Sequence, residues 1–182
     1  MGQSLLRRRV MGGGGGLLPS GYTQIDLHVY TTKQYVDTNL RIVQGLTYRF
    51  ETKVKWDTVS SSLRQLMGSD YLPFWGCDKG KWAHTLSPES GTNVLEDVWY
   101  DVVAESTSNR AEQACLIFNC NNGGSSAVKP VDSYSCYCTI KDYYKIYTNN
   151  VLTACFIPCT NPNNEEGMYD IISGVFSPLI QG

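Results

Sequence analysis

Residues 46–56 alternate between apolar and polar side chains at every position except Thr52. The apolar residues Leu46, Tyr48, Phe50, Val54 and Trp56 share one parity, and Thr47, Arg49, Glu51, Lys53 and Lys55 share the other. A period of two sends successive side chains to opposite faces of a strand, whereas a helix needs a period near 3.6. The stretch therefore predicts a β-strand with one buried face and one wet face.

Further strand-like segments follow, with turn signals between them. We predict strands over 98–104, 114–118, 137–147 and 151–157. The pair Asn149-Asn150 lies between the last two and predicts a tight hairpin turn, because Asn tolerates a positive φ. Residues 58–67 are the best candidate for a short helix or turn. Many short strands separated by turns indicate an all-β sandwich or barrel.

The chain has 182 residues, which suits one domain and a tail. We predict a flexible tail over 1–18 and a folded domain over 19–182. The tail contains Leu5, Leu6, Arg7, Arg8 and Arg9, followed by five glycines at 12–16. This basic segment is either a peptide that docks onto a partner or a disordered arm. The glycines stand where a signal peptide has its apolar region, so no signal peptide is expected.

Charge and hydropathy exclude two classes of function. The net charge is −2 and the sequence pI is about 5.6, which argues against a nucleic-acid partner. No apolar stretch approaches the roughly 20 residues that a spanning helix needs, so no membrane insertion is expected.

Seven cysteines raise disulfides, metal binding and catalysis as possibilities. His28 and His84 are the only two histidines, and neither has metal-ligand spacing to a cysteine. The pairs Cys136/Cys138 and Cys155/Cys159 are weak metal signals by themselves. We therefore predict reduced, mostly buried thiols, with no metal and no cofactor. The chain also lacks a GxSxG motif and a cysteine-protease signature, so no catalytic residue is assigned and no enzyme is predicted.

An aromatic segment in the middle of the chain is the candidate ligand site. Tyr71, Trp75 and Trp82 flank the polar residues Asp78 and Lys79. Aromatic rings beside polar groups can stack on the apolar face of a sugar, which makes these three residues candidates for glycan binding. The competing interpretation is that the same rings pack in the core.

Two ends of the predicted domain carry a family resemblance. The first contains LPSGYTQID at 18–26 and KQYVDT at 33–38. The second contains KIY at 145–147, NVL at 150–152, FIPC at 156–159 and GMYDIISGVF at 167–176. In order and spacing these segments resemble concanavalin A-like (laminin-G-like) domains of phage fibre and capsid-decoration proteins. The usual Glu-Tyr-Ile-Glu-Ser of the family start is replaced here by Asp-Leu-His-Val-Tyr at 26–30.

The resemblance implies a two-sheet antiparallel jelly-roll sandwich with a flexible N-terminal tail. It further implies a phage virion structural protein (head fibre, tail fibre or capsid decoration) that displays a lectin-like sandwich for attachment to a host surface or glycan. Its expected partners are capsid or tail proteins, other copies of itself and a host-surface glycan. The resemblance also implies assembly into the virion in the bacterial cytoplasm, with Leu5, Leu6 and Arg7 to Arg9 as the virion anchor. The alternative is a free-standing carbohydrate-binding module of a gut bacterium.

A glycoside hydrolase on the same fold is the third possibility. Such an enzyme needs two carboxylates that converge in one groove. The sequence contains no strand-borne Glu-x-Asp-x-x-Glu run, so this possibility is not favoured.

Overall fold

A computed structural model describes residues 16–31, 34–59, 64–68, 74–109, 113–119, 128 and 137–181, and for Phe74 and Trp75 it describes the backbone alone. Within these ranges the chain forms β-strands and no helix, which confirms the predicted all-β class. No helix in this part of the chain has the length and hydropathy that crossing a membrane requires. The tail at 1–15, with the five candidate anchor residues, lies outside the described ranges.

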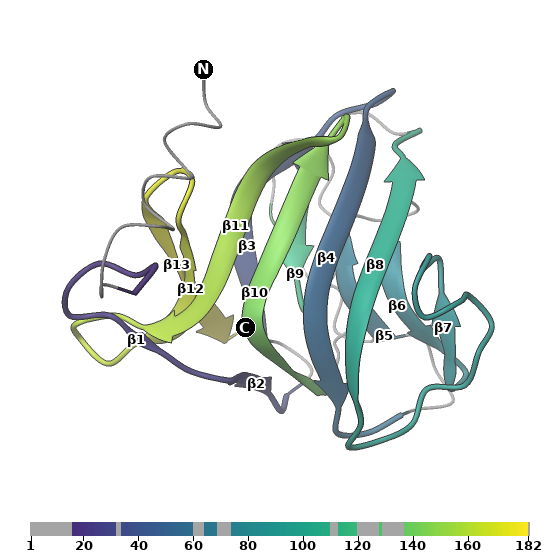
Figure 1. Cartoon of the computed structure of the whole chain (residues 1–182), viewed down its shortest axis with the longest axis horizontal. Helices are drawn as coiled ribbons and strands as arrows, with labels where there is room; N and C mark the ends of the chain where they lie inside the picture. Colours follow the sequence, from purple (N-terminus) through teal and green to yellow (C-terminus); the bar gives the residue numbers. More distant parts are fainter. Residues whose placement is uncertain are drawn as a thin grey trace.

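The strands form an antiparallel array (Figure 1). They are β1 (Thr23–Gln24), β2 (Leu27–Val29), β3 (Gln34–Ile42), β4 (Thr47–Trp56), β5 (Arg64–Gly68), β6 (Phe74–Asp78), β7 (Lys81–Ala83), β8 (Trp99–Thr107), β9 (Gln113–Ile117), β10 (Cys138–Thr148), β11 (Val151–Thr160), β12 (Glu166–Asp170) and β13 (Val175–Gln181). Their spatial order is β7-β6-β5-β9-β3-β13-β12-β11-β10-β4-β8, while β1 pairs with β11 and β2 with β10.

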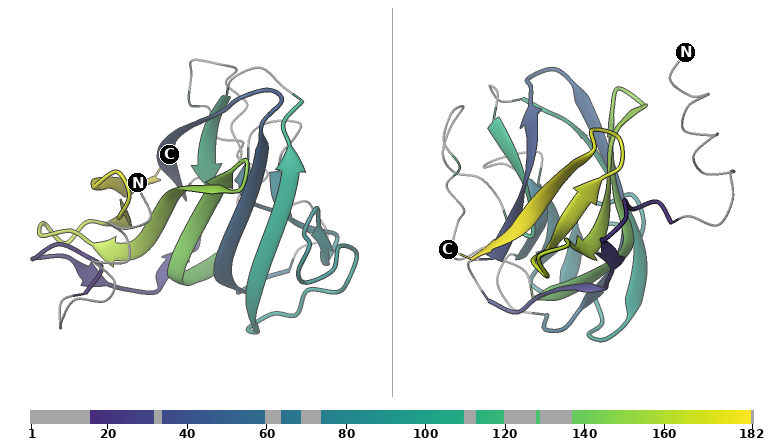
Figure 2. Two further views of the ribbon diagram at one scale, coloured as in Figure 1. Left: turned by 45° about the horizontal axis from the view of Figure 1, so that its top comes forward. Right: turned by 90° about the vertical axis from the view of Figure 1, so that its left-hand side faces the viewer.

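The array curls back on itself. Strands β5, β6 and β9 lie behind β10, β4 and β8, as the two turned views also show (Figure 2). Strand β13 pairs with β12 on one side and with β3 on the other, so it links the front strands to the rear strands. This curl encloses the core.

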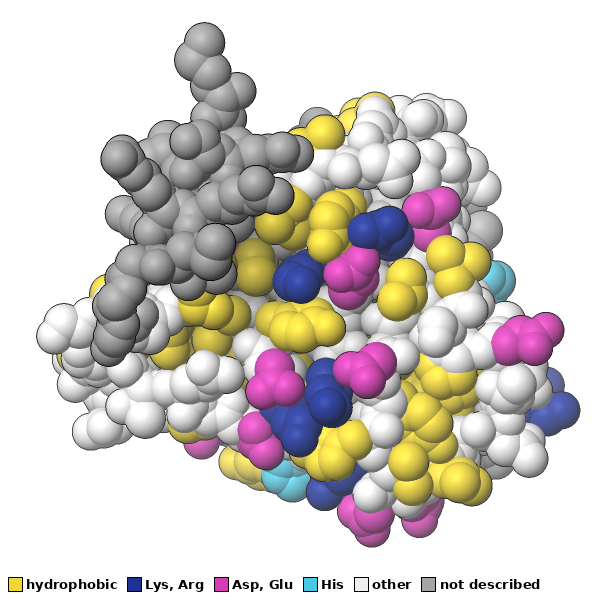
Figure 3. Space-filling model, in the orientation of Figure 1, with side chains coloured by type: hydrophobic (Ala, Val, Ile, Leu, Met, Phe, Trp, Pro, Cys, Tyr) yellow, Lys and Arg dark blue, Asp and Glu magenta, His cyan; other side chains and the backbone are white. Residues whose placement is uncertain are grey.

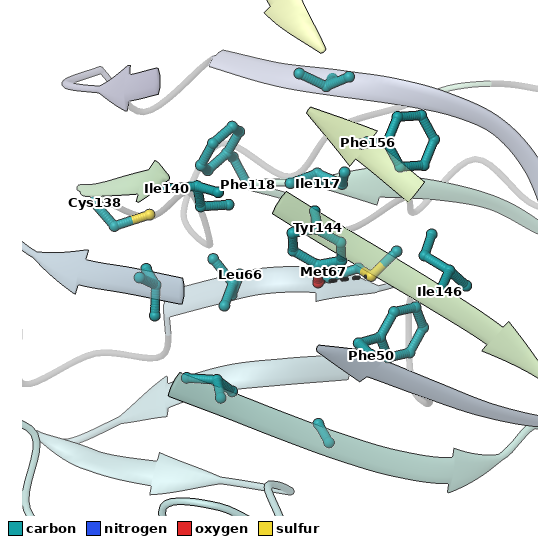
Figure 4. Packing of buried hydrophobic residues seen from close by; sticks show 14 of the residues in the cluster. Phe50, Leu66, Met67, Ile117, Phe118, Cys138, Ile140, Tyr144, Ile146 and Phe156 are labelled. Carbon is teal, nitrogen blue, oxygen red and sulfur yellow. Dashed lines mark hydrogen bonds between the residues drawn. The ribbon is translucent and has the colours of Figure 1, made fainter. Parts of the chain in front are cut away.

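The core confirms the alternation predicted over 46–56. Tyr48, Phe50, Val54 and Trp56 are buried, and the intervening residues of β4 are half-buried on the outer side. Figure 4 shows Tyr144 of β10 and Met67 of β5 meeting inside the core, where the Tyr144 hydroxyl donates to the Met67 sulfur at 2.8 Å. Front and rear strands are thus in direct side-chain contact.

Four predicted strands and one turn are confirmed. The segments at 98–104, 114–118, 137–147 and 151–157 correspond to β8, β9, β10 and β11. Asn149 and Asn150 have φ of 47° and 65°, and they connect Thr148 to Val151 at the end of the β10–β11 ladder. Two successive positive φ values are typical of a type I′ turn, whose backbone twist matches the right-handed twist of the two strands that it joins.

The short helix or turn predicted over 58–67 is wrong from Arg64 onward. These residues form β5, which pairs with β6 on one side and with β9 on the other. Leu66 and Met67 are both buried, because the β5–β6 register shifts between Gln65 and Met67 and the inserted Leu66 breaks the alternation of side chains. A strand interrupted in this way has no regular period, so its sequence does not reveal it.

The N-terminal segment passes from β11 to β10. Thr23 and Gln24 pair with the end of β11, the Ile25 N–H donates to the Pro158 carbonyl at 3.1 Å, and β2 then pairs with residues 138–140 of β10. This segment therefore occupies the place beside β10 that β11 takes further along the strand.

One glycine of the β12–β13 hairpin is required by close packing. A Cβ at Gly167 would lie 2.3 Å from the Ser177 carbonyl oxygen and 2.8 Å from the Pro178 Cα. We predict that Gly167→Ala lowers the free energy of unfolding by about 1–3 kcal/mol, because backbone must move to admit the methyl group. Chemical denaturation measures this, with Gly16→Ala as control since no atom lies within 4 Å of its Cβ position. Equal midpoints for the two variants would contradict the prediction.

Candidate functional site

Trp82, one of the three candidate glycan-binding residues, lies in the core. Its side chain is 1% exposed, and its ring makes edge contacts with Trp56 at 6.0 Å and with Tyr100 at 5.2 Å between centroids. A ring enclosed in this way has no face to offer a sugar. The assignment of Trp82 to glycan stacking is therefore withdrawn in favour of core packing.

The other two candidates are not brought to a site by the described structure. Tyr71 lies outside the described residues, and Trp75 is described only as a backbone position in β6, opposite Met67 of β5. Both remain sequence-based expectations.

A different aromatic set lies on the outer face of the front sheet. The half-buried rings of Trp99 on β8 and of Tyr143 and Tyr147 on β10 occupy this face. Sequence reasoning missed them because each ring is a single outward residue in a strand and no local cluster marks it. Figure 3 shows hydrophobic and charged side chains interspersed over these strands. We call this surface the outer face.

Each ring on the outer face has a cation beside it. Lys141 Nζ lies 4.2 Å from the centroid of Trp99, Lys145 Nζ lies 4.2 Å from that of Tyr143, and Arg49 Cζ lies 4.3 Å from that of Tyr147. A cation over an aromatic ring is attracted by the negative face of the π system. These contacts restrain the flexible side chains along the sheet.

Glu51 joins two of these groups. Its carboxylate forms an ion pair with Arg49 at 2.8 Å and accepts a hydrogen bond from the Tyr147 hydroxyl at 3.1 Å. Burial, followed by the charge of Glu51 and its hydrogen bond, raises the pKa of Tyr147, while Arg49 acts in the opposite direction. The Glu51 carboxylate is therefore bonded to two side chains of the protein itself, Arg49 and Tyr147.

A β-bulge of two extra residues interrupts β10 on the outer face. Lys141 faces Lys53 and Tyr144 faces Thr52, so Asp142 and Tyr143 are inserted between two consecutive positions of β4. Asp142 adopts a positive φ of 66°. The Thr52 hydroxyl donates to the Tyr143 carbonyl at 2.9 Å and explains the polar residue on the buried side of β4.

Tyr143 projects from this bulge into a group of carboxylates. Burial first, then the charges of Asp101, Glu51 and Asp142, raise the pKa of its hydroxyl. The phenol is therefore neutral at physiological pH. Asp101 and Asp142 are both exposed.

A second polar group holds β2 against the front sheet. His28 Nε2 lies 2.7 Å from an oxygen of Asp57, and Lys55 Nζ lies 3.9 Å from the other Asp57 oxygen and 3.5 Å from Asp97. The charged groups of His28, Asp57 and Lys55 thus have partners within the protein, and they connect the end of β4 to the N-terminal segment.

The prediction of buried, reduced thiols is confirmed for the cysteines that the structure describes. Cys77, Cys115, Cys138, Cys155 and Cys159 are all buried free thiols. Burial raises the pKa of Cys155 to about 11 and that of Cys159 to about 11. Protonated thiols are poor nucleophiles and poor metal ligands at neutral pH. Cys120 and Cys136 lie outside the described residues.

The described residues contain no group of three or more His, Cys, Asp or Glu side chains placed to hold a metal ion.

The raised thiol pKa values predict a loss of stability at high pH. Cys155 and Cys159 ionise in the unfolded chain near their ordinary pKa of 9.0 but near 11 when folded. Stability is therefore complete below pH 9 and falls as the pH rises from 9 to 11. Chemical denaturation across this range should show a smaller decline for the Cys155→Ala/Cys159→Ala variant, because it lacks both titrating groups. Parallel declines for the two proteins would contradict this prediction.

Comparisons of the chain with protein-family models, with curated proteins and with solved structures find no match.

Proposed function

We propose that the chain is a phage virion structural protein that displays a concanavalin A-like jelly-roll sandwich for attachment to a host surface. The observation that carries the proposal is the contact between the two ends of the family resemblance. Tyr22, from the opening segment, packs against Tyr169 at 5.1 Å and Phe176 at 5.8 Å from the closing segment. Segments separated by more than a hundred residues in sequence are neighbours in space.

The glycines of these segments have backbone roles. Gly21 and Gly174 have φ of 86° and 77°, and Gly167 lies against the backbone of β13. Only glycine adopts such conformations without strain, or fits such a close approach. The residues that carry the resemblance therefore have backbone roles, and they support a common fold. The function does not follow from the fold and rests on analogy with the family.

The curled array supports the two-sheet arrangement of the proposal. In this interpretation the front sheet is β8-β4-β10-β11 and the rear sheet is β7-β6-β5-β9-β3, connected through β12 and β13. Contacts such as Trp56 with Trp82 join the two across the core.

The position of the N-terminal segment suits a protein that is anchored at one end. Tyr22 lies against β12 and β13, while β8 ends the front sheet on the far side (Figure 1). Attachment to capsid or tail proteins through Leu5, Leu6 and Arg7 to Arg9 would leave β8 and the outer face free to meet a host surface. Display in several copies, as a homo-oligomer, would strengthen weak individual contacts.

Purified particles of the phage that encodes the chain test the proposal. We expect the full-length chain to be found in density-purified particles by mass spectrometry. We expect a chain lacking residues 2–16 to be absent from them, because the anchor is gone. Circular dichroism of the truncated protein controls for folding.

The experiment tests the virion role and the anchoring role of the tail separately. If the full-length chain is missing from the particles, the virion role is overturned, and glycan binding in that case would favour a free-standing carbohydrate-binding module. If the truncated chain is incorporated normally, the anchoring role of the tail is overturned.

A further inference from the structure

Exposed apolar side chains gather on the segment that leads into β8. Nine large hydrophobic side chains are exposed among the described residues, and three of them fall within residues 86–98. They are Leu86 at 61%, Leu95 at 58% and Val98 at 39%, and we call them the apolar strip. Figure 3 shows hydrophobic side chains gathered beside the lower part of β8. Exposed apolar surface that gathers in one place marks an interaction site, whereas single exposed residues do not.

Hydrogen bonds to β8 hold the apolar strip in place. The Leu86 N–H donates to the Val103 carbonyl at 2.7 Å, and the Leu95 N–H donates to the Tyr100 hydroxyl at 2.9 Å. Val98 directly precedes the strand. The three side chains are thus attached along β8 between residues 98 and 103, which corresponds to about 17 Å of extended chain. A surface that is already ordered loses little conformational entropy when a partner binds.

The segment that carries the apolar strip is acidic. Residues 84–101 contain four carboxylate side chains and no Lys or Arg. All four are exposed: Glu89, Glu96, Asp97 and Asp101. Two lysines of β4 offset part of this charge, since Lys55 Nζ lies 3.5 Å from Asp97 and Lys53 faces Asp101 in the β4–β8 register. The remaining negative charge favours a partner that combines apolar side chains with cations.

The chain itself contains a segment of this composition, in its predicted tail. Leu5 and Leu6 directly precede Arg7, Arg8 and Arg9, and residues 1–16 contain no Asp or Glu. The whole chain has 15 Lys and Arg against 17 Asp and Glu. Three of these cations belong to the tail, which leaves 12 cations against 17 anions, a net charge of −5, for residues 17–182. Two folded domains therefore repel each other, whereas the tail and a domain attract.

The tail is better placed to reach a second copy than its own apolar strip. The domain begins beside β12 and β13, where Tyr22 packs against Tyr169 and Phe176, and β8 lies four strands away from β12. Four strand spacings amount to about 19 Å. The chain from Arg9 to Leu17 includes five glycines. Its root-mean-square span is about 16 Å, so binding to its own strip would require an extended path across the front sheet.

From these observations we propose that the apolar strip of one copy binds the N-terminal tail of a second copy, with the two leucines of the tail on the strip and its three arginines beside the carboxylates. The inference rests on the proposed function and gives the tail a second partner. Each copy has one tail and one strip, so the contact is head-to-tail and joins copies in series. In a fibre, the first tail would bind the capsid or tail protein and each later tail the preceding copy. The outer face and the strip of the last copy stay free.

Size-exclusion chromatography with light scattering tests the contact on the full-length chain. We expect the mass to rise above the 20.3 kDa of one chain as the protein concentration increases. Raising the salt from about 0.1 M to about 1 M should lower the mass again, because salt screens the attraction between arginines and carboxylates. An excess of a synthetic peptide of residues 1–16 should also restore the mass of one chain, since it occupies the strip. A chain that stays monomeric at every concentration, or an oligomer that survives the peptide, would overturn the proposal.

Variants locate the site by fluorescence anisotropy of the labelled 1–16 peptide on the dilute full-length chain. Leu86→Ser and Leu95→Ser should each weaken peptide binding by about tenfold, equivalent to about 1.4 kcal/mol. A peptide with Glu in place of all three arginines should also bind about tenfold more weakly or worse. The matched control is Val151→Ser, which removes an apolar side chain that is 65% exposed at the β10–β11 turn. Denaturation midpoints confirm that each variant is folded.

Unchanged affinity in the folded leucine variants would overturn the apolar strip as the site, as would an equal loss in Val151→Ser. Unchanged affinity of the glutamate peptide would overturn the pairing of arginines with carboxylates. These measurements use the isolated protein, whereas the virion role is measured on purified particles. A chain that is present in particles but stays monomeric loses this inference alone, and one that associates but is absent from particles loses the virion role alone.

Discussion

The pairing of β10 with β4 is the interaction on which the rest of the fold depends. Their ladder runs from Cys138 opposite Trp56 to Thr148 opposite Tyr48. It buries Phe50, Ile140, Tyr144 and Ile146 on the inner side and sets the outward residues of the outer face on the other. Because side chains alternate along both strands, a slip of one residue would exchange the two faces. Core and surface are fixed by the same register.

Buried polar groups near this ladder are mostly satisfied, and they fix local geometry. The Asp170 carboxylate accepts from the backbone N–H groups of Cys155, Ile172 and Ser173, which connects β11 to the β12–β13 turn. Thr38 similarly donates to the Cys115 carbonyl at 2.7 Å. The indole N–H groups of Trp56 and Trp82 are exceptions within the described structure, where they have no hydrogen-bond partner.

The bulge in β10 has a structural reason. Strand β10 must accept β2 along its first half and β11 along its second, and the extra residues lie where these neighbours change. The same insertion sets Tyr143 outward among carboxylates. A residue with a positive φ, here Asp142, costs conformational free energy unless the surroundings hold it in place. Thr52 supplies that restraint from the buried side.

The sequence by itself determined the all-β class, the strand at 46–56, the hairpin turn at Asn149 and Asn150, and the burial of the described cysteines. Each follows from a local property: side-chain period, tolerance of positive φ, or the apolar character of a thiol. Only the tertiary structure revealed that residues 64–68 form a strand, since a register shift at Leu66 breaks the side-chain period. It also moved Trp82 into the core and brought Trp99, Tyr143 and Tyr147 onto one face. Which rings reach solvent depends on which strands pair and in which register, and those pairings join residues far apart in the chain.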